Sequence, residues 1–262
     1  MQLTNRKTPK TITLFQFLKR SKVGYAAIAS LLKIDMHNHL LPSIDDGAEN
    51  IATSQALANS LQQLGYTHTI CTPHIMSGMY NNTPNTIGTA KAQLVNTGSY
   101  PLSLVHAAAE YMLDEAFLQQ LQQPEPLLTL YDNWILVEFS YVAAPLMYQD
   151  IFFQIQLKGY RPILAHPERY SYFANDLQNY EGLKAMGCML QLNALSLGGY
   201  YGKTAQVVAQ HLLQEKLVSF IGTDTHAQRH IDALQHMQLD RKTFDLIQQQ
   251  PLQHAKLLAA YA

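Results

Sequence analysis

Cysteine is scarce in this sequence, which has only Cys71 and Cys188 among 262 residues. Two cysteines cannot form the multi-disulfide framework of a small secreted protein, and both stand in apolar stretches that favour buried free thiols. Cysteine-dependent phosphatases also need an arginine shortly after the nucleophile, but the residues six positions on are Ser77 and Ala194. The sequence therefore excludes that class of enzyme, and a reducing, cytoplasmic location is expected.

Charge and long apolar runs are scarce as well. Charged residues make up 14% of the chain and the net charge is -1, so the strongly basic surface of a nucleic-acid-binding protein is not expected. No apolar run reaches the roughly 20 residues that a transmembrane helix needs. The sequence also lacks a G-x-x-x-x-G-K-[ST] phosphate loop and a G-x-S-x-G nucleophile elbow. A hydrophobic fraction of 47% is nevertheless ample for a globular core.

The first 33 residues contain no acidic side chain but carry Arg6, Lys7, Lys10, Lys19, Arg20, Lys22 and Lys33. We expect residues 1–33 to form a basic N-terminal extension and residues 34–262 to form a single domain. The extension is interpreted as an extra helix that packs beside the domain. A signal peptide and a contact with anionic lipid or an acidic partner are the alternatives.

Short apolar runs alternate with longer helical patterns from Lys33 onward. This alternation is typical of repeated βα units around a parallel sheet. The predicted strands are 33–37, 67–71, 103–109, 134–139, 161–165, 189–193 and 218–223. The predicted helices are 51–64, 86–96, 114–122, 145–158, 177–186 and 203–215, and the tail 241–262 is predicted to form two helices divided at Pro251.

Side chains that can bind a metal follow nearly every predicted strand. His37 and His39 end the first strand, where alternation puts them on one face. The later strands, except the sixth, end in His74, Glu110, Glu138, His166, and the pair Asp224 and His226. The C-terminal ends of strands in a parallel βα barrel converge on one mouth, where such folds carry their active sites. We therefore expect these eight side chains to share one site.

The candidate ligands are imidazoles and carboxylates without a thiolate. This mixture suits Mn²⁺, Fe²⁺ or Zn²⁺ and disfavours a structural cysteine–zinc site. Mn²⁺ is the first candidate, with Fe²⁺ or Zn²⁺ as alternatives. Eight ligands exceed the needs of one ion, so two or three divalent ions are predicted, with Glu110 as a candidate bridge. Closely spaced metal ions generate hydroxide at neutral pH and stabilise charge on a phosphoryl group. Phosphate ester hydrolysis is the predicted reaction.

Two further residues lie near these ligands in the sequence. Asp46 follows the first strand and is a candidate for holding a metal-associated water or protonating the leaving oxygen; a simple turn before the helix 51–64 is its alternative. Arg169 stands three residues after His166, where its guanidinium could bind a phosphoryl group in bidentate fashion; an ordinary surface arginine is its alternative. The remaining histidines that we considered are interpreted as core or surface residues: His68, His106, His211, His236 and His254.

Taken in order, the motifs resemble one branch of the polymerase and histidinol phosphatase (PHP) superfamily, the bacterial CpsB/YwqE-type protein tyrosine phosphatases of capsular and exopolysaccharide operons. The segments that carry this resemblance are D-M-H-N-H-L-L-P-S-I-D-D-G-A, T-P-H-I-M-S-G-M-Y, A-A-E-Y, V-E-F, P-I-L-A-H-P-E-R-Y, Q-L-N-A-L-S-L-G-G-Y-Y-G and G-T-D-T-H, between residue 35 and about 230. The resemblance implies a distorted seven-stranded, TIM-like (β/α)7 barrel with three metal ions.

The resemblance also implies roles and partners. It assigns the eight predicted ligands as metal ligands and adds Asp46 and Arg169 as active-site residues. The family has a second phosphate-binding arginine after the last ligand, and Arg229 is the candidate here from a shifted position. The implied activity is hydrolysis of phosphotyrosine by a metal-held hydroxide, with the Tyr-rich tail of a bacterial tyrosine kinase as substrate.

Two other functions remain open at this point. A small-molecule phosphatase of the histidinol phosphatase type would use the same metals with a different rim around the site. A catalytically inactive PHP domain would serve as an interaction module, although the complete ligand set argues against it. The sequence favours the phosphotyrosine phosphatase.

Overall fold

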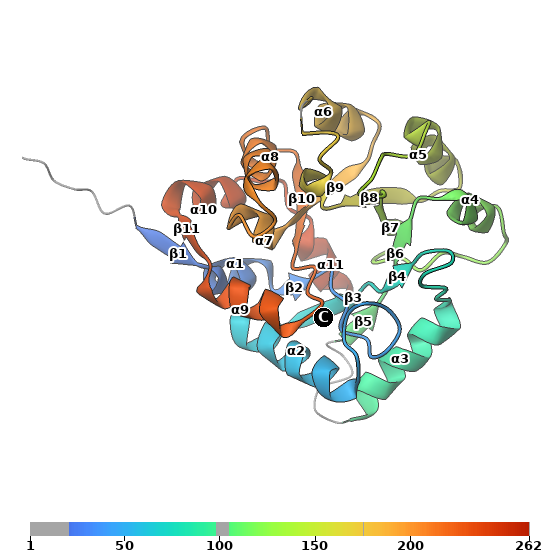
Figure 1. Ribbon diagram of the computed structural model, residues 1–262, viewed down its shortest axis with the longest axis horizontal. Coiled ribbons are helices and arrows are strands. Elements are labelled where there is room, and N and C mark those ends of the chain that lie inside the picture. The colour runs from blue at the N-terminus through green and yellow to red at the C-terminus, as the bar shows by residue number, and fades with distance from the viewer. Residues whose placement is uncertain (1–20, 98–104, 175, 262) are drawn as a thin grey trace, which may run out of the picture.

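The computed structural model describes residues 21–97, 105–174 and 176–261, which form a mixed α/β fold with parallel sheets (Figure 1). Most helices lie outside the strands in this view, whereas α11 (His254–Tyr261) lies near the centre, close to β2 (Ile34–Asp35), β3 (His68–Cys71) and β10 (Val218–Gly222). The basic residues Arg6, Lys7, Lys10, Lys19 and Arg20, and the predicted strand residues 103–104, lie outside the described part of the chain.

The parallel strands form two sheets. The larger sheet has the order β10-β9-β8-β7-β6-β4 and the smaller one the order β2-β3-β5. Their bounds are β2 (Ile34–Asp35), β3 (His68–Cys71), β4 (His74–Ile75), β5 (Val105–Ala107), β6 (Glu110–Met112), β7 (Trp134–Glu138), β8 (Arg161–Ala165), β9 (Met189–Asn193) and β10 (Val218–Gly222). The second and third strand segments are interrupted: β3 and β5 lie within the predicted ranges 67–71 and 103–109, whereas β4 and β6 follow just beyond those ranges.

The ends of β2 and β10 are held together by backbone and side-chain hydrogen bonds. The backbone N–H of Asp224 donates to the carbonyl of His37 over 2.7 Å. The buried carboxylate of Asp35 accepts two bonds from Thr223, 3.0 Å from the backbone N and 2.7 Å from Oγ1. The first and last groups of predicted ligands are thereby brought side by side, although nearly two hundred positions separate them in sequence.

The helices lie close to the predicted ranges. They are α1 (Tyr25–Leu32), α2 (Ile51–Leu64), α3 (Pro84–Asn96), α4 (Glu115–Leu121), α5 (Tyr148–Leu157), α6 (Gln178–Ala185), α7 (Ala194–Leu197), α8 (Lys203–Gln214), α9 (Gln228–His236), α10 (Arg241–Gln248) and α11 (His254–Tyr261). Local chemistry sets the ends of α2: the Asn50 side chain accepts from the backbone N of Thr53, and Gly65 has a left-handed φ of 116°. The sequence analysis did not predict α7 or α9.

The described part of the N-terminal extension packs against the rest of the chain. β1 (Lys22–Gly24) pairs antiparallel with β11 (Gln238–Asp240), and α1 buries Tyr25, Ile28 and Leu32 in the main core. This agrees with the interpretation of an extra helix that packs beside the domain. Within the described residues, no helix is both long and apolar enough to cross a membrane.

The core has two parts. The larger cluster includes the apolar faces of the helices and the side chains of the strands that meet them. The smaller cluster takes its side chains from strands of both sheets, including Ile34, Ile70, Leu136, Ile163 and Phe220, all of which are buried. Strand alternation sends neighbouring side chains into different clusters, so both faces of these short strands are covered.

Candidate metal centre

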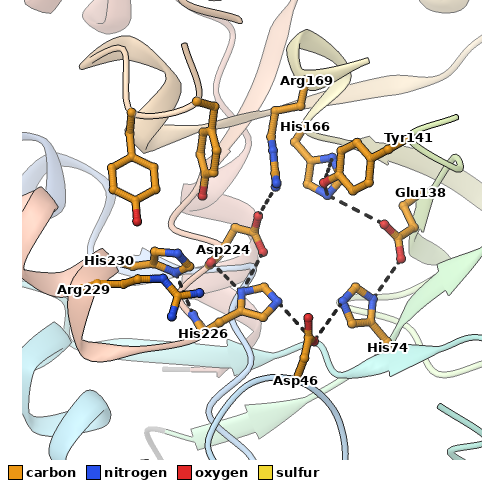
Figure 2. A pocket seen from close by; sticks show the side chains of 12 residues that line it. Asp46, His74, Glu138, Tyr141, His166, Arg169, Asp224, His226, Arg229 and His230 are labelled. Atoms are coloured by element: carbon orange, nitrogen blue, oxygen red, sulfur yellow. Dashed lines mark hydrogen bonds and ion pairs between the residues drawn. The ribbon is translucent and has the colours of Figure 1, made fainter. Parts of the chain in front are cut away.

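The eight predicted ligands meet at one end of the strands. His37 and His39 follow β2, His74 begins β4, Glu110 begins β6, Glu138 ends β7, His166 follows β8, and Asp224 and His226 follow β10. All are buried except His226, which is partly exposed. Figure 2 shows the outer part of this cluster, with side chains from different elements pointing toward a common centre.

Glu110 lies in the middle of the cluster. Its Oε2 is 3.1 Å from His37 Nε2, 3.4 Å from His39 Nε2 and 3.3 Å from His74 Nδ1. Its Oε1 is 3.1 Å from His166 Nε2. One carboxylate that faces four imidazoles has the arrangement of a bridge between metal ions.

The ligand atoms form four overlapping sets within which every atom lies within 4.8 Å of the others. The sets are His37, Glu110 and His166; His37, His39 and Asp224; His74, Glu110 and Glu138; and His39, Asp46, His74 and His226. Nitrogen and oxygen donors around several neighbouring points match a centre for more than one divalent ion.

Two buried polar atoms without hydrogen bonds support the presence of a cation at this centre. His74 Nδ1 and Glu138 Oε1 lie 2.9 Å apart, within ion-pair distance, but neither atom makes a hydrogen bond of acceptable geometry to a described residue. Buried polar atoms without partners are costly. A divalent cation between a carboxylate oxygen and an imidazole nitrogen would remove that cost, so the donor set fits a metal.

Hydrogen bonds behind the imidazoles orient them toward the centre. His37 Nδ1 lies 2.9 Å from Gln191 Oε1, and His39 Nδ1 lies 2.8 Å from Asp45 Oδ2. A ring that donates from Nδ1 to an oxygen has an unprotonated Nε2, which is the form that binds metals. Gln191 and Asp45 therefore set the tautomers of His37 and His39.

The electrostatics of the centre favour positive charge. Burial alone would raise the pKa of Glu110, but His37 and His166 outweigh burial and hold the pKa well below its ordinary range. Burial would lower the pKa of His37, but Glu110 and Asp224 raise it to about 9. Without metal, the acids therefore keep a proton on His37. Metal ions would take the place of such protons.

Two of the predicted ligands sit on strained backbone. His166 has a φ of 33° and Asp224 a φ of 52°, both in the left-handed region that residues other than glycine seldom adopt. Such strain is costly and is concentrated at functional sites. A steric restriction explains the glycine of the D-D-G motif, because a Cβ on Gly47 would lie 2.0 Å from the carbonyl O of His39. Only glycine lets the loop after β2 fold back over this ligand.

Asp46 lies at the mouth of the centre between two imidazoles. Its Oδ1 is 3.5 Å from the Nε2 atoms of both His74 and His226. Burial raises its pKa, but the hydrogen bond and charge of His226 lower it to about 2. Asp46 is therefore ionised at neutral pH, a state suited to a ligand or a proton acceptor.

Arg169 lies between two aromatic rings and a ligand. Its Nη1 donates to Asp224 Oδ2 over 2.6 Å, and its Cζ lies 4.9 Å from the ring centroid of Tyr141 and 4.1 Å from that of Tyr201. These two cation–π contacts and the hydrogen bond to Asp224 restrict the orientation of the guanidinium. Since its side chain keeps 20% exposure, an edge remains open to the pocket.

A cavity of about 310 Å³ opens above the centre and is lined by ligands, by Arg169 and Arg229, and by Tyr141, Tyr200, Tyr201 and His230 (Figure 2). Arg229, which the sequence suggested from a shifted position, therefore faces the same space as Arg169. The cavity combines two guanidinium groups, aromatic side chains and a cluster of metal-binding donors. This chemistry suits an anionic group attached to an aromatic ring.

Several residues at the site were not predicted from the sequence. Gln191 and Asp45 orient imidazoles, Tyr141 and Tyr201 stack on Arg169, and His230 accepts from the backbone N of His226 over 3.1 Å at Nδ1. Gln191 carried a usable signal, since it is a polar residue inside an apolar strand. Tyrosines in loops have no periodic pattern that would single them out.

Comparison with known proteins agrees with this geometry. Residues 33–238 match the family described as capsular polysaccharide synthesis, CpsB/CapC. The chain is 32% identical over 197 residues to tyrosine-protein phosphatase YwqE of Bacillus subtilis (strain 168), covering 74% of this chain and 77% of the relative. It is 27% identical over 202 residues to tyrosine-protein phosphatase CpsB of Streptococcus pneumoniae, covering 74% of this chain and 82% of the relative.

A solved structure is similar as well. It comes from work on YwqE from Bacillus subtilis and CpsB from Streptococcus pneumoniae, described as unique metal-dependent tyrosine phosphatases. It superposes with a TM-score of 0.71 and 29% identity over 86% of this chain and 91% of that chain. Sequence and structure thus agree, and the chain belongs to the CpsB/CapC family of capsular polysaccharide synthesis.

Proposed function

We propose that this chain is a metal-dependent phosphotyrosine phosphatase. The observation that carries the proposal is the contact of Glu110 with four imidazoles beneath a cavity that also presents Arg169 and Arg229. The relatives named as tyrosine-protein phosphatases support the same substrate class.

The metal ligands in this proposal are His37, His39, His74, Glu110, Glu138, His166, Asp224 and His226, with Asp46 as a further donor at the mouth. Two or three divalent ions are proposed, with Mn²⁺ as the first candidate and Fe²⁺ and Zn²⁺ as alternatives that the same nitrogen and oxygen donors accept. When bound, such ions supply a strong nucleophile at neutral pH and stabilise negative charge on the phosphoryl group.

The side chains of the chain itself orient the substrate. Arg169 and Arg229 bind non-bridging phosphoryl oxygens, and the stacked guanidinium of Arg169 does so with little loss of side-chain freedom. Tyr141, Tyr200 and Tyr201 line the cavity and contact the phenol ring of the substrate. The ionised Asp46 accepts a proton at Oδ1 during attack by water and would return it to the leaving phenolate oxygen.

The finer architecture is also part of the proposal. We infer a distorted seven-stranded barrel formed by residues 34–262, in which the interrupted second and third strands link the two sheets. The parallel bridge between Asn38 and Thr225 and the cluster of strand side chains enclosed by both sheets support this closure. In such a barrel the ligands project from the C-terminal strand ends.

The proposed substrate is a phosphotyrosine protein in the cytoplasm, and the Tyr-rich tail of a bacterial tyrosine kinase is the candidate. The test compares hydrolysis of a phosphotyrosine peptide, p-nitrophenyl phosphate and histidinol phosphate by the purified chain with Mn²⁺. The proposal predicts the highest kcat/KM for the two aryl phosphates. A strong preference for histidinol phosphate would indicate a small-molecule phosphatase, and no turnover of any substrate would indicate an inactive interaction module.

A further inference from the structure

An uncharged loop with exposed apolar side chains lies beside the cavity. Residues 140–147, which we name the rim loop, connect β7 to α5 and read S-Y-V-A-A-P-L-M. Val142 is 90% exposed, Leu146 93% and Met147 69%. Apolar side chains grouped on a surface in this way are typical of binding sites.

The rim loop begins inside the active-site cavity. Tyr141 lines the cavity, where its ring stacks on His166 at a centroid distance of 5.6 Å and also contacts the guanidinium of Arg169 (Figure 2). The base of the loop is fixed, because Tyr172 Oη donates to the carbonyl of Ser140 over 2.9 Å. The exposed residue Val142 is thus adjacent in sequence to a residue of the cavity wall.

We propose that the rim loop binds apolar side chains that flank the phosphotyrosine of a peptide or protein substrate. This inference rests on the phosphatase function proposed above. A phosphotyrosine whose phosphate reaches Arg169 must carry its main chain across the rim of the cavity. An extended peptide advances about 3.3 Å per residue, and Val142 adjoins the cavity residue Tyr141 in the chain, so the residues next to the phosphotyrosine would lie beside Val142 and the rest of the rim loop.

The chemistry of the rim loop favours a peptide over other occupants. A membrane-binding loop usually adds basic residues that attract anionic lipid, and the rim loop has none. A stable dimer usually buries about 800 Å² per partner, which is more than a few side chains of one loop provide. The loop is continuous with the cavity where the phosphotyrosine would bind, and this continuity selects the substrate as its occupant.

The test uses the full chain with Mn²⁺ and two exposed apolar positions. The variant Val142→Ser/Leu146→Ser is compared with the matched control Val207→Ser/Leu31→Ser, which changes exposed residues on α8 and α1. Substrates are p-nitrophenyl phosphate and two phosphotyrosine peptides, one with leucine and valine next to the phosphotyrosine and one with serine at those positions.

The unchanged protein is expected to prefer the apolar peptide about tenfold in kcat/KM, which is the scale of one or two interface contacts. The rim-loop variant should lose this preference through a higher KM and keep its rate on p-nitrophenyl phosphate, while the control keeps both. Equal rates on the two peptides, an equal loss in the control, or a loss on p-nitrophenyl phosphate as well would overturn the rim-loop proposal.

Failure of the underlying function gives a different result. Absence of turnover on p-nitrophenyl phosphate and on both peptides would refute the phosphatase itself, and the rim-loop proposal with it. Size-exclusion chromatography and flotation with phosphatidylglycerol vesicles complete the test. A dimer or vesicle binding that disappears in Val142→Ser/Leu146→Ser would assign the loop to a second copy or a membrane and contradict a peptide occupant.

Discussion

Arg169 donates a 2.6 Å hydrogen bond from Nη1 to Oδ2 of Asp224. The carboxylate of Asp224 also faces His37 and His226 through its other oxygen, at 3.5 and 3.4 Å. One side chain therefore connects the group that we propose to bind phosphate with the group that we propose to bind metal. This connection fixes the guanidinium over the cluster before substrate arrives.

The first prediction concerns Arg169→Lys. Lysine keeps the charge but loses the planar fork that binds phosphate in bidentate fashion and stacks on Tyr141 and Tyr201. We expect kcat/KM for p-nitrophenyl phosphate to fall by about 10²–10³, the range observed when one oriented donor is removed from an active site. Metal content, measured by mass spectrometry, should stay unchanged. A rate within threefold of the unchanged protein would contradict the assigned role.

A second prediction separates the ring of Tyr201 from its hydroxyl. The ring lies 4.1 Å from Arg169 Cζ, whereas the hydroxyl accepts a long hydrogen bond of 3.4 Å from Asn193 Nδ2 and makes no other within the described residues. Tyr201→Phe should therefore behave like the unchanged protein. Tyr201→Leu removes a cation–π contact of about 0.5–2 kcal/mol and should weaken inhibition by inorganic phosphate about threefold to thirtyfold. Equal inhibition constants for the two variants would show that the ring does not position Arg169.

A third prediction concerns the residue behind His37. Gln191→Met keeps the side-chain length but removes the oxygen 2.9 Å from His37 Nδ1. Loss of such an orienting partner typically lowers metal affinity about 10–100-fold. Titration of the metal-free protein with Mn²⁺ measures this change, and Gln119→Met, at an exposed position of α4, is the control. Unchanged Mn²⁺ affinity in Gln191→Met would mean that the hydrogen bond to Gln191 is not needed to orient His37.

The fourth prediction concerns the pH dependence of stability. It uses a histidine that is distant in sequence from the proposed metal ligands. Burial lowers the pKa of His254 to about 4, and its Nε2 lies 2.9 Å from the carbonyl of Ile221. In the unfolded chain this histidine titrates near 6.5. The unfolded state therefore binds a proton first, and stability falls as pH drops from about 6.5 toward 4.

The expected loss from this residue between pH 7 and pH 5 is at most about 2 kcal/mol, at about 1.4 kcal/mol per pKa unit. Urea unfolding of the protein and of His254→Gln at both pH values measures it. Comparing the two proteins cancels the other titrating groups. The variant should lose less stability on acidification, and a parallel loss in both proteins would show that His254 is not buried in its neutral form.

Much of the fold could be predicted because its strands and helices differ in period and length. Helix α2 was predicted at its observed bounds, because its helical pattern ends at Gly65, and the structure adds Asn50 as its N-cap. Helix α9 was missed because Ile231 and Leu234 are its only buried apolar residues, too few for a periodic signal. Its position is set by tertiary packing against α1 and α2, which is absent from a local pattern.

The part of the candidate site that could be predicted is the part whose position follows from strand geometry. Residues at the ends of parallel strands converge, so the sequence analysis could group ligands as distant as His37 and Asp224. The orienting groups follow no such rule. Asp45 reaches His39 only because the loop folds back at Gly47, and Tyr201 reaches Arg169 from a different loop. These contacts depend on three-dimensional loop conformation.

The central claim is that side chains scattered along the chain bind metal together around Glu110. The most direct test measures metal content and p-nitrophenyl phosphate hydrolysis of the purified protein and of Glu110→Ala, with circular dichroism to verify folding. We predict two or three divalent ions per chain in the unchanged protein, and loss of both bound metal and turnover in a folded Glu110→Ala. A folded variant that keeps its metal content and rate, or an unchanged protein that is active without metal, would contradict the account.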